Sequence, residues 1–310
     1  MIARIMKKHR KIFDIIQLRK EDAAMQINII NVITAIDYIE NNLADKLDLE
    51  IVAGAVHYSK YHLHRIFTET VGLTIHDYVQ RRKLTEAAKL LIFSDKPIIE
   101  IALIAGYESQ QAFTTIFKLL YKKSPHQYRE AEEFYPLQLR YVLNKEPTKV
   151  STEIDWKRDI LYAVDNDVPA WMDLVHLVVD GFPYLKESEY LEQLKEYIQK
   201  KQALIMKDGA IIIGAMAFNC ETGSIDFLGV HPQYRKKDIA KAFLQKVWSE
   251  LLKDTPISIT TFREGDKADP GYRELFKKLG FAEAELLIEF GYPTQKLTLQ
   301  KEDLEVSDCE

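Results

Sequence analysis

The chain has 310 residues, 47% of them hydrophobic and 29% charged, and a formal net charge of −5 at pH 7. This composition is ordinary for a soluble globular protein and leaves room for two or three hydrophobic cores. It excludes a membrane helix, because no uninterrupted apolar stretch approaches roughly 18 residues. A disulfide framework is excluded too, because two cysteines, Cys220 and Cys309, are too few to make one. Their small number fits a reducing cytoplasm.

The first 28 residues are a basic N-terminal extension that lacks the apolar centre of a signal peptide. This extension is either an arm that touches DNA phosphates or a consequence of start-site choice. The second interpretation arises because Met25 lies just before the first predicted helix, residues 29–42. The sequence leaves both interpretations open.

Residues 51–67 and 101–117 are two versions of one helix-turn-helix pattern. The matched positions are Ser59 with Ser109, Leu63 with Phe113, Ile66 with Ile116 and Phe67 with Phe117. A single pattern of this kind often marks only an αα-hairpin in a helical protein. Two in tandem, joined by a helix, indicate duplicated DNA-reading units.

The second helix of each pattern has one apolar and one polar face. An apolar stripe at spacing i, i+3, i+4 must face a core. The residues expected inside are Leu63, Ile66 and Phe67 in the first copy and Phe113, Ile116, Phe117 and Leu120 in the second. The opposite face carries side chains that can hydrogen-bond base edges, namely Tyr, His, Arg, Gln and Thr. Its lysines can contact the DNA phosphates. The expected DNA-binding residues are Lys60, Tyr61, His64, Arg65, Gln110, Gln111, Thr114, Thr115 and Lys118.

Residues 74–94, between the two patterns, read as a long amphipathic helix. The residues expected inward are Tyr78, Val79, Leu84, Ala87, Ala88 and Leu91. A rigid connector fixes the distance between the two recognition helices, and adjacent major-groove windows on one DNA face lie roughly 34 Å apart. One chain therefore suffices to read both windows.

Residues from about 29 to 133 resemble the DNA-binding domain of AraC-type transcriptional regulators. The motifs that carry the resemblance are residues 49–53, residues 59–67, Gly72-Leu73-Thr74 with Tyr78, Arg82 and Leu84, Ile101-Ala102 with Gly106-Tyr107-Glu108-Ser109, and Ser124-Pro125 with Tyr128-Arg129. Thr115 stands where relatives often have an arginine, and Lys123 replaces the usual glycine. The resemblance implies sequence-specific DNA binding, and Thr115 predicts an altered base preference or a weaker second half-site.

The negative net charge does not oppose DNA binding, because the local distribution of charge matters more than its sum. The basic residues expected near the DNA face are Lys60, Arg65, Arg81, Arg82, Lys83, Lys118, Lys122, Lys123 and Arg129. His57, His62 and His64 lack the spacing of a zinc site, so no metal is expected.

Residues 134–159 have mixed polarity and read as a linker, and from about residue 160 the pattern becomes α/β. The predicted helices are residues 168–179 and 187–201, one that starts near Lys237 and one that ends at Gly280. The predicted strands are residues 203–208, 210–218, 224–230 and 257–262. Asp208-Gly209 is a strong hairpin signal between the first two strands.

The third strand runs through a basic turn into a helix, an arrangement that can bind a pyrophosphate. Free N–H groups and the helix dipole both favour an anion at a helix N-terminus. Arg235, Lys236, Lys237 and Lys241 add positive charge around this turn.

Residues 160–292 resemble the GNAT acetyltransferase superfamily. Residues 230–244 match its acetyl-CoA segment, whose core is R/Q-x-x-G-x-G/A. The resemblance implies that the amides of Lys237 to Ala240 take the pyrophosphate and that the strand near Leu228 lines the pantetheine arm. The cofactor-binding residues it implies are Leu228, Val230, Arg235, Lys236, Lys237, Asp238, Ile239, Ala240 and Lys241.

Two residues depart from the GNAT pattern. Asp238 occupies the first glycine position, which puts a Cβ and a carboxylate beside the phosphates, although it is also expected to cap the helix. Phe276 replaces the tyrosine that protonates the leaving thiolate in many members, and Tyr272, one turn earlier, is the substitute candidate. The general-base candidates are Asp226, Glu264 and Asp266, acting through a water.

The predicted fold is therefore multidomain. An all-α tandem helix-turn-helix domain spans residues 29–133, and an α+β GNAT-like acyl-CoA N-acyltransferase fold spans residues 160–300, before an acidic tail at 301–310. Three interpretations of the second domain stay open. It is an active N-acetyltransferase, or it senses coenzyme A, an acyl-CoA or an amine without catalysis, or it mainly provides a protein interface. The expected partners are double-stranded DNA, acetyl-CoA and an unidentified small amine in the cytoplasm, with RNA polymerase a further candidate.

Overall fold

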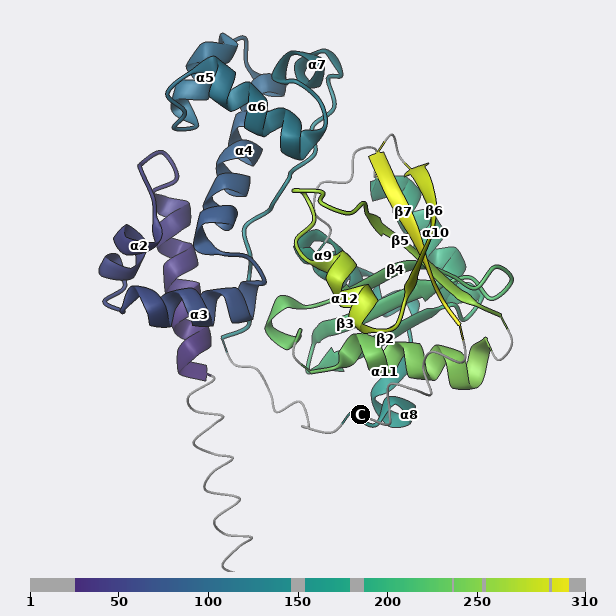
Figure 1. The fold of residues 1–310 in the computed structure, drawn as a ribbon. Coiled ribbons are helices and arrows are strands. Elements are labelled where there is room, and N and C mark those ends of the chain that lie inside the picture. Colours follow the sequence, from purple (N-terminus) through teal and green to yellow (C-terminus); the bar gives the residue numbers. More distant parts are fainter. Residues whose placement is uncertain are drawn as a thin grey trace, which may run out of the picture.

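The computed structural model describes residues 26–145, 154–178, 187–235, 237–252, 255–289 and 292–300. It contains a helical domain, coloured purple to teal in Figure 1, beside a second domain built on a sheet. The predictions for residues 1–25, for Lys236 and for the acidic tail lie outside the described residues. In the described part of the chain, no helix combines the length and apolar character needed to cross a membrane.

The first helix-turn-helix unit packs three helices around one core. Its helices are residues 26–41, α2 (Leu49–Ala55) and α3 (Lys60–Val71). α3 begins after Ser59, whose hydroxyl accepts a hydrogen bond from the amide of His62. It ends at Gly72, whose φ of 80° is the left-handed conformation that favours glycine. The apolar side of α3, with Phe67 at its centre, packs against the first helix.

The second unit repeats this arrangement further along a connecting helix (Figure 1). The helices are the connector α4 (Ile75–Phe93), then α5 (Ile98–Ile104), α6 (Gln110–Tyr121) and α7 (Pro125–Glu130). All six α4 residues predicted to point inward are buried, which confirms the connector. α6 is capped by Ser109 and buries Phe113 and Phe117 beside the rings of Tyr121 and Tyr128.

Residues 134–145, predicted as the start of a linker, lie against the helical domain. Leu137 packs in the core of the second unit and Tyr141 in the core of the first. The amide of Leu137 donates a hydrogen bond to the buried hydroxyl of Thr85 (3.1 Å). This segment therefore joins the two cores along α4.

The second domain is built on a seven-stranded sheet with the order β1-β2-β3-β4-β5-β7-β6. Its strands are β1 (Ile160–Tyr162), β2 (Ala203–Asp208), β3 (Ile211–Phe218), β4 (Ser224–Val230), β5 (Ile257–Phe262), β6 (Ala282–Glu289) and β7 (Tyr292–Leu299). β4 and β5 pair in parallel, and all other neighbours are antiparallel. The four predicted strands are present, whereas β1, β6 and β7 were not predicted.

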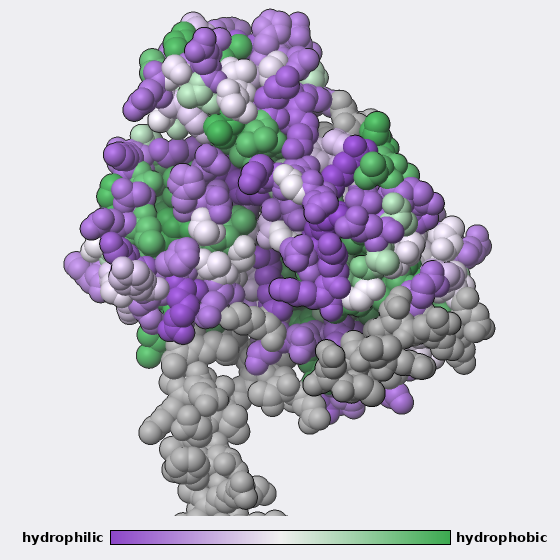
Figure 2. Space-filling view, in the orientation of Figure 1, coloured by the Kyte–Doolittle hydropathy of each residue, from purple (hydrophilic) through white to green (hydrophobic). Residues whose placement is uncertain are grey.

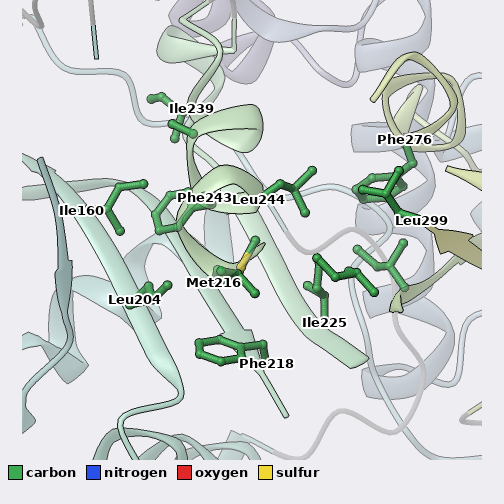
Figure 3. Close-up of a cluster of buried hydrophobic side chains, with 14 of the residues drawn as sticks. Ile160, Leu204, Met216, Phe218, Ile225, Ile239, Phe243, Leu244, Phe276 and Leu299 are labelled. Atoms are coloured by element: carbon green, nitrogen blue, oxygen red, sulfur yellow. The ribbon is translucent and has the colours of Figure 1, made fainter. Parts of the chain in front are cut away.

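Helices cover both faces of the sheet. They are α8 (Trp156–Asp159), the 3-10 turn η1 (Asp165–Asp167), α9 (Val168–Val178), α10 (Glu187–Gln199), the 3-10 turn η2 (Pro232–Tyr234), α11 (Ile239–Lys246), the π-helical turn η3 (Val247–Leu251) and α12 (Tyr272–Lys278). α9 and α10 pack around Trp171 on one face, and α11 packs around Phe243 on the other (Figure 3). Gly214 of β3 permits this packing, because a Cβ there would lie 2.6 Å from Ile239.

The two domains touch one another. Figure 2 shows mostly hydrophilic side chains along their visible boundary. Polar contacts cross this boundary, including a hydrogen bond from Arg81 to the carbonyl of Ala268 and an ion pair between Lys122 and Asp266. Polar contacts of this kind are typical of interfaces between domains of one chain.

Candidate DNA interface and acyl-CoA site

The polar face of α3 is open to solvent. All four of its predicted DNA-binding residues are exposed, and the Tyr61 side chain is 80% exposed. These residues are Lys60, Tyr61, His64 and Arg65. The apolar stripe on the other side is buried, which confirms the predicted division of the helix into two faces. The exposed residues lie in the N-terminal half of α3, the part that approaches base edges when a recognition helix enters the major groove.

α6 presents a second polar face with weaker chemistry. Gln110, Gln111, Thr115 and Lys118 are exposed, Thr114 is half-buried, and Ile116, predicted inside, is only half-buried. The Thr115 hydroxyl donates a hydrogen bond to the carbonyl of Gln111 (2.9 Å), so its proton is used within the helix. α6 therefore offers glutamine amides and one lysine to DNA, and it has no arginine that could form a bidentate hydrogen bond with a guanine.

Two arginines predicted near the DNA face are in fact part of the helical core. Arg81 and Arg82 are only 3% and 7% exposed. Arg82 forms an ion pair with the buried carboxylate of Glu40 (2.8 Å), and Arg81 donates to the carbonyl of Ala268 in the second domain (2.7 Å). The prediction for both was wrong, because the helix positions that looked solvent-exposed face partners far away in the sequence.

Three further basic residues are bound within the protein. Lys83 donates to the carbonyl of Asp45 (2.7 Å), Lys122 pairs with Asp266 (2.7 Å), and Arg129 donates to two main-chain carbonyls. The predicted basic face is thus smaller than the sequence suggested. Of its described cations, Lys60, Arg65 and Lys118 are exposed and Lys123 is half-buried.

β4 and β5 separate part of the way along the sheet. They pair at Ser224 with Ser258 and at Ile225 with Ile259, and their pairing ends there. Beyond this point β4 continues through Asp226 to Val230, while β5 stays paired with β7 on its other side. Leu228 and Val230 are only partly buried and pack at the margin of the main core. Among the described residues, β4 therefore has no backbone pairing with β5 from Asp226 to Val230.

The β4–α11 loop, residues 231–235 with 237 and 238, leaves the end of β4 and leads into α11. Asp238 precedes the helix with a φ of 50°, the left-handed conformation, which explains why glycine suits this position. Its side chain makes no capping hydrogen bond, so the predicted cap is wrong. The amide of Lys237 bonds to the carbonyl of Tyr234 (3.0 Å). The first amides of α11, from Ile239, are the donors available for an anion.

His231 is a buried site residue that the sequence did not single out. Burial and the nearby charge of Arg235 lower the pKa of His231 to about 4, from 6.5. Between these pH values the unfolded chain binds a proton that the folded chain does not. We therefore expect the protein to lose up to about 3 kcal/mol of stability between pH 6.5 and pH 4 relative to His231→Gln. Urea unfolding of both proteins at several pH values measures this, and parallel pH profiles would contradict it.

The structure brings two of the four catalytic candidates, Asp226 and Tyr272, to the split between β4 and β5. Asp226 is exposed just past the last β4–β5 pair and accepts a hydrogen bond from the hydroxyl of Tyr197 in α10. The hydroxyl of Tyr272 donates a hydrogen bond to the carbonyl of Val178 (2.8 Å). The side chain of Val178 lies beside Gly229 of β4. Tyr197 was not predicted, because it comes from a helix 29 residues earlier with no motif of its own.

The other acid–base candidates lie elsewhere. Glu264 is exposed in the loop after β5. Asp266 is held by Lys122, the hydroxyl of Tyr292 and an amide, which makes it a structural residue. Phe276 is buried in the core against Phe281. Within the described part of the chain, no cluster of three or more His, Cys, Asp or Glu side chains is arranged to hold a metal ion.

Two helix-turn-helix units, followed by a mixed sheet in which β4 and β5 part before the turn into α11, define a helix-turn-helix domain joined to a domain with the GNAT fold. Comparison with protein families agrees, since a helix-turn-helix domain profile matches residues 52–131 and an acetyltransferase (GNAT) domain profile matches residues 180–291. The chain belongs to the AraC-type helix-turn-helix transcriptional regulators and carries a GNAT domain after the DNA-binding domain.

The similarity to individual proteins is confined to parts of the chain. The multiple antibiotic resistance protein MarA of Escherichia coli is 41% identical over 100 residues, which are 32% of this chain and 79% of MarA. The HTH-type transcriptional regulator YbfP of Bacillus subtilis is 40% identical over 94 residues, so the chain spans about a third of YbfP (32%). A GNAT-family acetyltransferase structure from Bacillus cereus aligns with 46% of this chain and 96% of its own at 16% identity and a TM-score of 0.36.

Proposed function

We propose that this protein is a sequence-specific transcriptional regulator that reads DNA with α3 and α6 and binds acetyl-CoA in its second domain. The observation that carries the DNA half is the pair of exposed polar faces on α3 and α6, joined by the buried connector α4. A single chain then contacts two adjacent major-groove windows, and α3 supplies the stronger contacts. The protein would act in the cytoplasm, with RNA polymerase as a further partner.

Arg65→Ala is expected to weaken binding to a selected operator by about 1–3 kcal/mol, because an arginine at a base edge supplies that much discrimination. Thr115→Ala should have a smaller effect, because the Thr115 hydroxyl is already bonded to Gln111. Fluorescence anisotropy with operator DNA measures both variants. Equal losses in the two variants would show that α6 contributes as much as α3, against the proposed asymmetry.

Acetyl-CoA would lie along the exposed side of β4, with its diphosphate at the N-terminus of α11. The amides from Asp238 to Ala240 would bond the phosphates, and Arg235, Lys237 and Lys241 would balance their charge. Leu228 and Val230 would contact the pantetheine arm. This arrangement is supported by the end of β4–β5 pairing at Ile225 and by the left-handed backbone at Asp238.

Acetyl transfer to a small amine requires a base and an acid at the split. Asp226 would remove a proton from the amine through a water, with Glu264 as the second candidate, and Tyr272 would protonate the departing thiolate. The alternative function is a non-catalytic sensor, and one observation favours it. The hydroxyl of Tyr272 already donates its proton to the Val178 carbonyl, so Tyr272 must first break that bond to protonate a thiolate.

Release of free thiol from acetyl-CoA in the presence of a panel of small amines separates the two functions. Catalysis predicts thiol release that depends on the amine and is lost in Asp226→Asn. The matched variant Tyr272→Phe should slow transfer while leaving acetyl-CoA affinity unchanged. Binding of acetyl-CoA without thiol release from any amine would leave the sensor as the function of this domain.

A further inference from the structure

The first recognition helix ends on the β4–α11 loop. Arg235 donates a hydrogen bond from Nη1 to the carbonyl oxygen of Val71, the last residue of α3 (2.7 Å). The fit is close, because a Cβ on Gly72 would lie 1.7 Å from this Nη1 atom. In the same loop, the Gln233 side chain exchanges two hydrogen bonds with the main chain of Asn144 (2.6 and 2.8 Å). The loop proposed to hold a diphosphate therefore also holds the first DNA-reading unit.

The second recognition helix ends on the loop that follows β5. Lys122, the C-cap of α6, lies 2.7 Å from the carboxylate of Asp266. The Asp266 side chain is only 6% exposed and also accepts a hydrogen bond from the Tyr292 hydroxyl (2.9 Å). In the same loop, the carbonyl of Ala268 receives a hydrogen bond from Arg81 of the connector α4.

These two loops continue from the two strands that separate beyond Ile225 and Ile259. One helix-turn-helix unit is thus attached to each side of the split. The polar faces of α3 and α6 remain exposed in this docked arrangement, so it is compatible with DNA binding. It also fixes the spacing of the two reading helices, and preorganisation of this kind favours binding because less freedom is lost in the complex.

We propose that acyl-CoA and DNA bind this chain antagonistically, with Arg235 as the side chain for which the two sites compete. The proposal rests on the acyl-CoA site proposed above. A guanidinium bonds a phosphate more strongly than it bonds a neutral carbonyl, because both partners are then charged and two parallel N–H···O bonds can form. A diphosphate at the start of α11 therefore draws Arg235 away from Val71 and releases α3 from its fixed position. Because linkage is reciprocal, DNA weakens acyl-CoA binding by the same factor.

Operator affinity of the full chain, measured with and without saturating acetyl-CoA, tests this coupling. The operator is first selected from random duplex DNA. We expect acetyl-CoA to raise the Kd for the operator at least about fivefold, the lower end of couplings between sites. Arg235→Gln loses the contact with Val71 and should bind the operator without acetyl-CoA as weakly as the unaltered protein does with it, with no further response. Acetyl-CoA is kept at a saturating concentration for both proteins, so a weaker acetyl-CoA affinity of Arg235→Gln does not affect the comparison of operator affinities.

Lys195→Gln is the matched control, because it removes one exposed positive charge from α10 of the same domain, outside the proposed acyl-CoA site, and keeps Arg235 in place. It should retain both the operator affinity and the response to acetyl-CoA, and circular dichroism verifies that each variant is folded. An unchanged or improved operator affinity, while calorimetry shows bound acetyl-CoA, overturns the antagonism. If calorimetry shows no binding, the acyl-CoA site itself is wrong. Normal operator affinity in Arg235→Gln then overturns the positioning role of Arg235 as well.

Discussion

Arg82→Met is expected to lower the free energy of unfolding by about 3–5 kcal/mol, because it leaves a buried carboxylate without its cation. The side chains of Arg82 and Glu40 are each 8% exposed, and two of the Arg82 nitrogens lie 2.8 Å from the two Glu40 oxygens. Arg82 also bonds the carbonyl of Gln138, which ties the segment after α7 to α4 (3.0 Å). Urea unfolding followed by circular dichroism measures the loss.

Lys89→Met is the matched control on the same helix. Lys89 pairs with Glu86, but these side chains are 44% and 40% exposed, and exposed pairs contribute about 0–1 kcal/mol. The control should therefore unfold close to the unaltered protein. If Arg82→Met instead keeps full stability and loses operator affinity, Arg82 contacts DNA and the structural role assigned to it is wrong.

Asp238→Gly is expected to bind acetyl-CoA about tenfold more tightly and to unfold at a higher denaturant concentration. The affinity rises because one carboxylate no longer repels the diphosphate, and two unit charges about 4 Å apart interact by about 1 kcal/mol even with the full screening of water. The stability rises because glycine adopts a φ of 50° without the penalty of a Cβ, on the order of 1 kcal/mol.

Asp238→Asn separates these two effects. Asparagine removes the charge but keeps a Cβ in the left-handed conformation, so it should give most of the gain in acetyl-CoA affinity and little of the gain in stability. Calorimetry and urea unfolding on the three proteins supply both quantities. Acetyl-CoA binding by Asp238→Gly that is no tighter than that of the unaltered protein would show that the diphosphate does not lie at this turn.

The elements that could be predicted are those with a strong local pattern. The stripe of Leu63, Ile66 and Phe67 and the short apolar runs of β2 to β5 depend on neighbouring residues alone, and the structure confirms the buried stripe and the four strands. β6 was missed because it is an edge strand whose residues are mostly exposed, so its sequence lacks a buried alternation. β1 has only three residues, too few to show a period.

The roles of the arginines could not be predicted, because each depends on a distant partner. Arg82 looks like a DNA-facing cation until Glu40, 42 residues earlier, is seen beside it. Arg235 matches a motif for phosphate, yet its guanidinium bonds Val71, 164 residues earlier in another domain. Asp238 was predicted to cap α11, and only its φ of 50° shows that the backbone there occupies the conformation suited to glycine.

We propose that one chain contains both a complete bipartite DNA reader and an acyl-CoA site. Calorimetric titration of the full chain, with the selected operator and separately with acetyl-CoA, measures both. We expect one operator duplex per chain and one acetyl-CoA per chain, each saturable. A requirement for two chains on one operator, or no heat from acetyl-CoA at millimolar concentration, would contradict it.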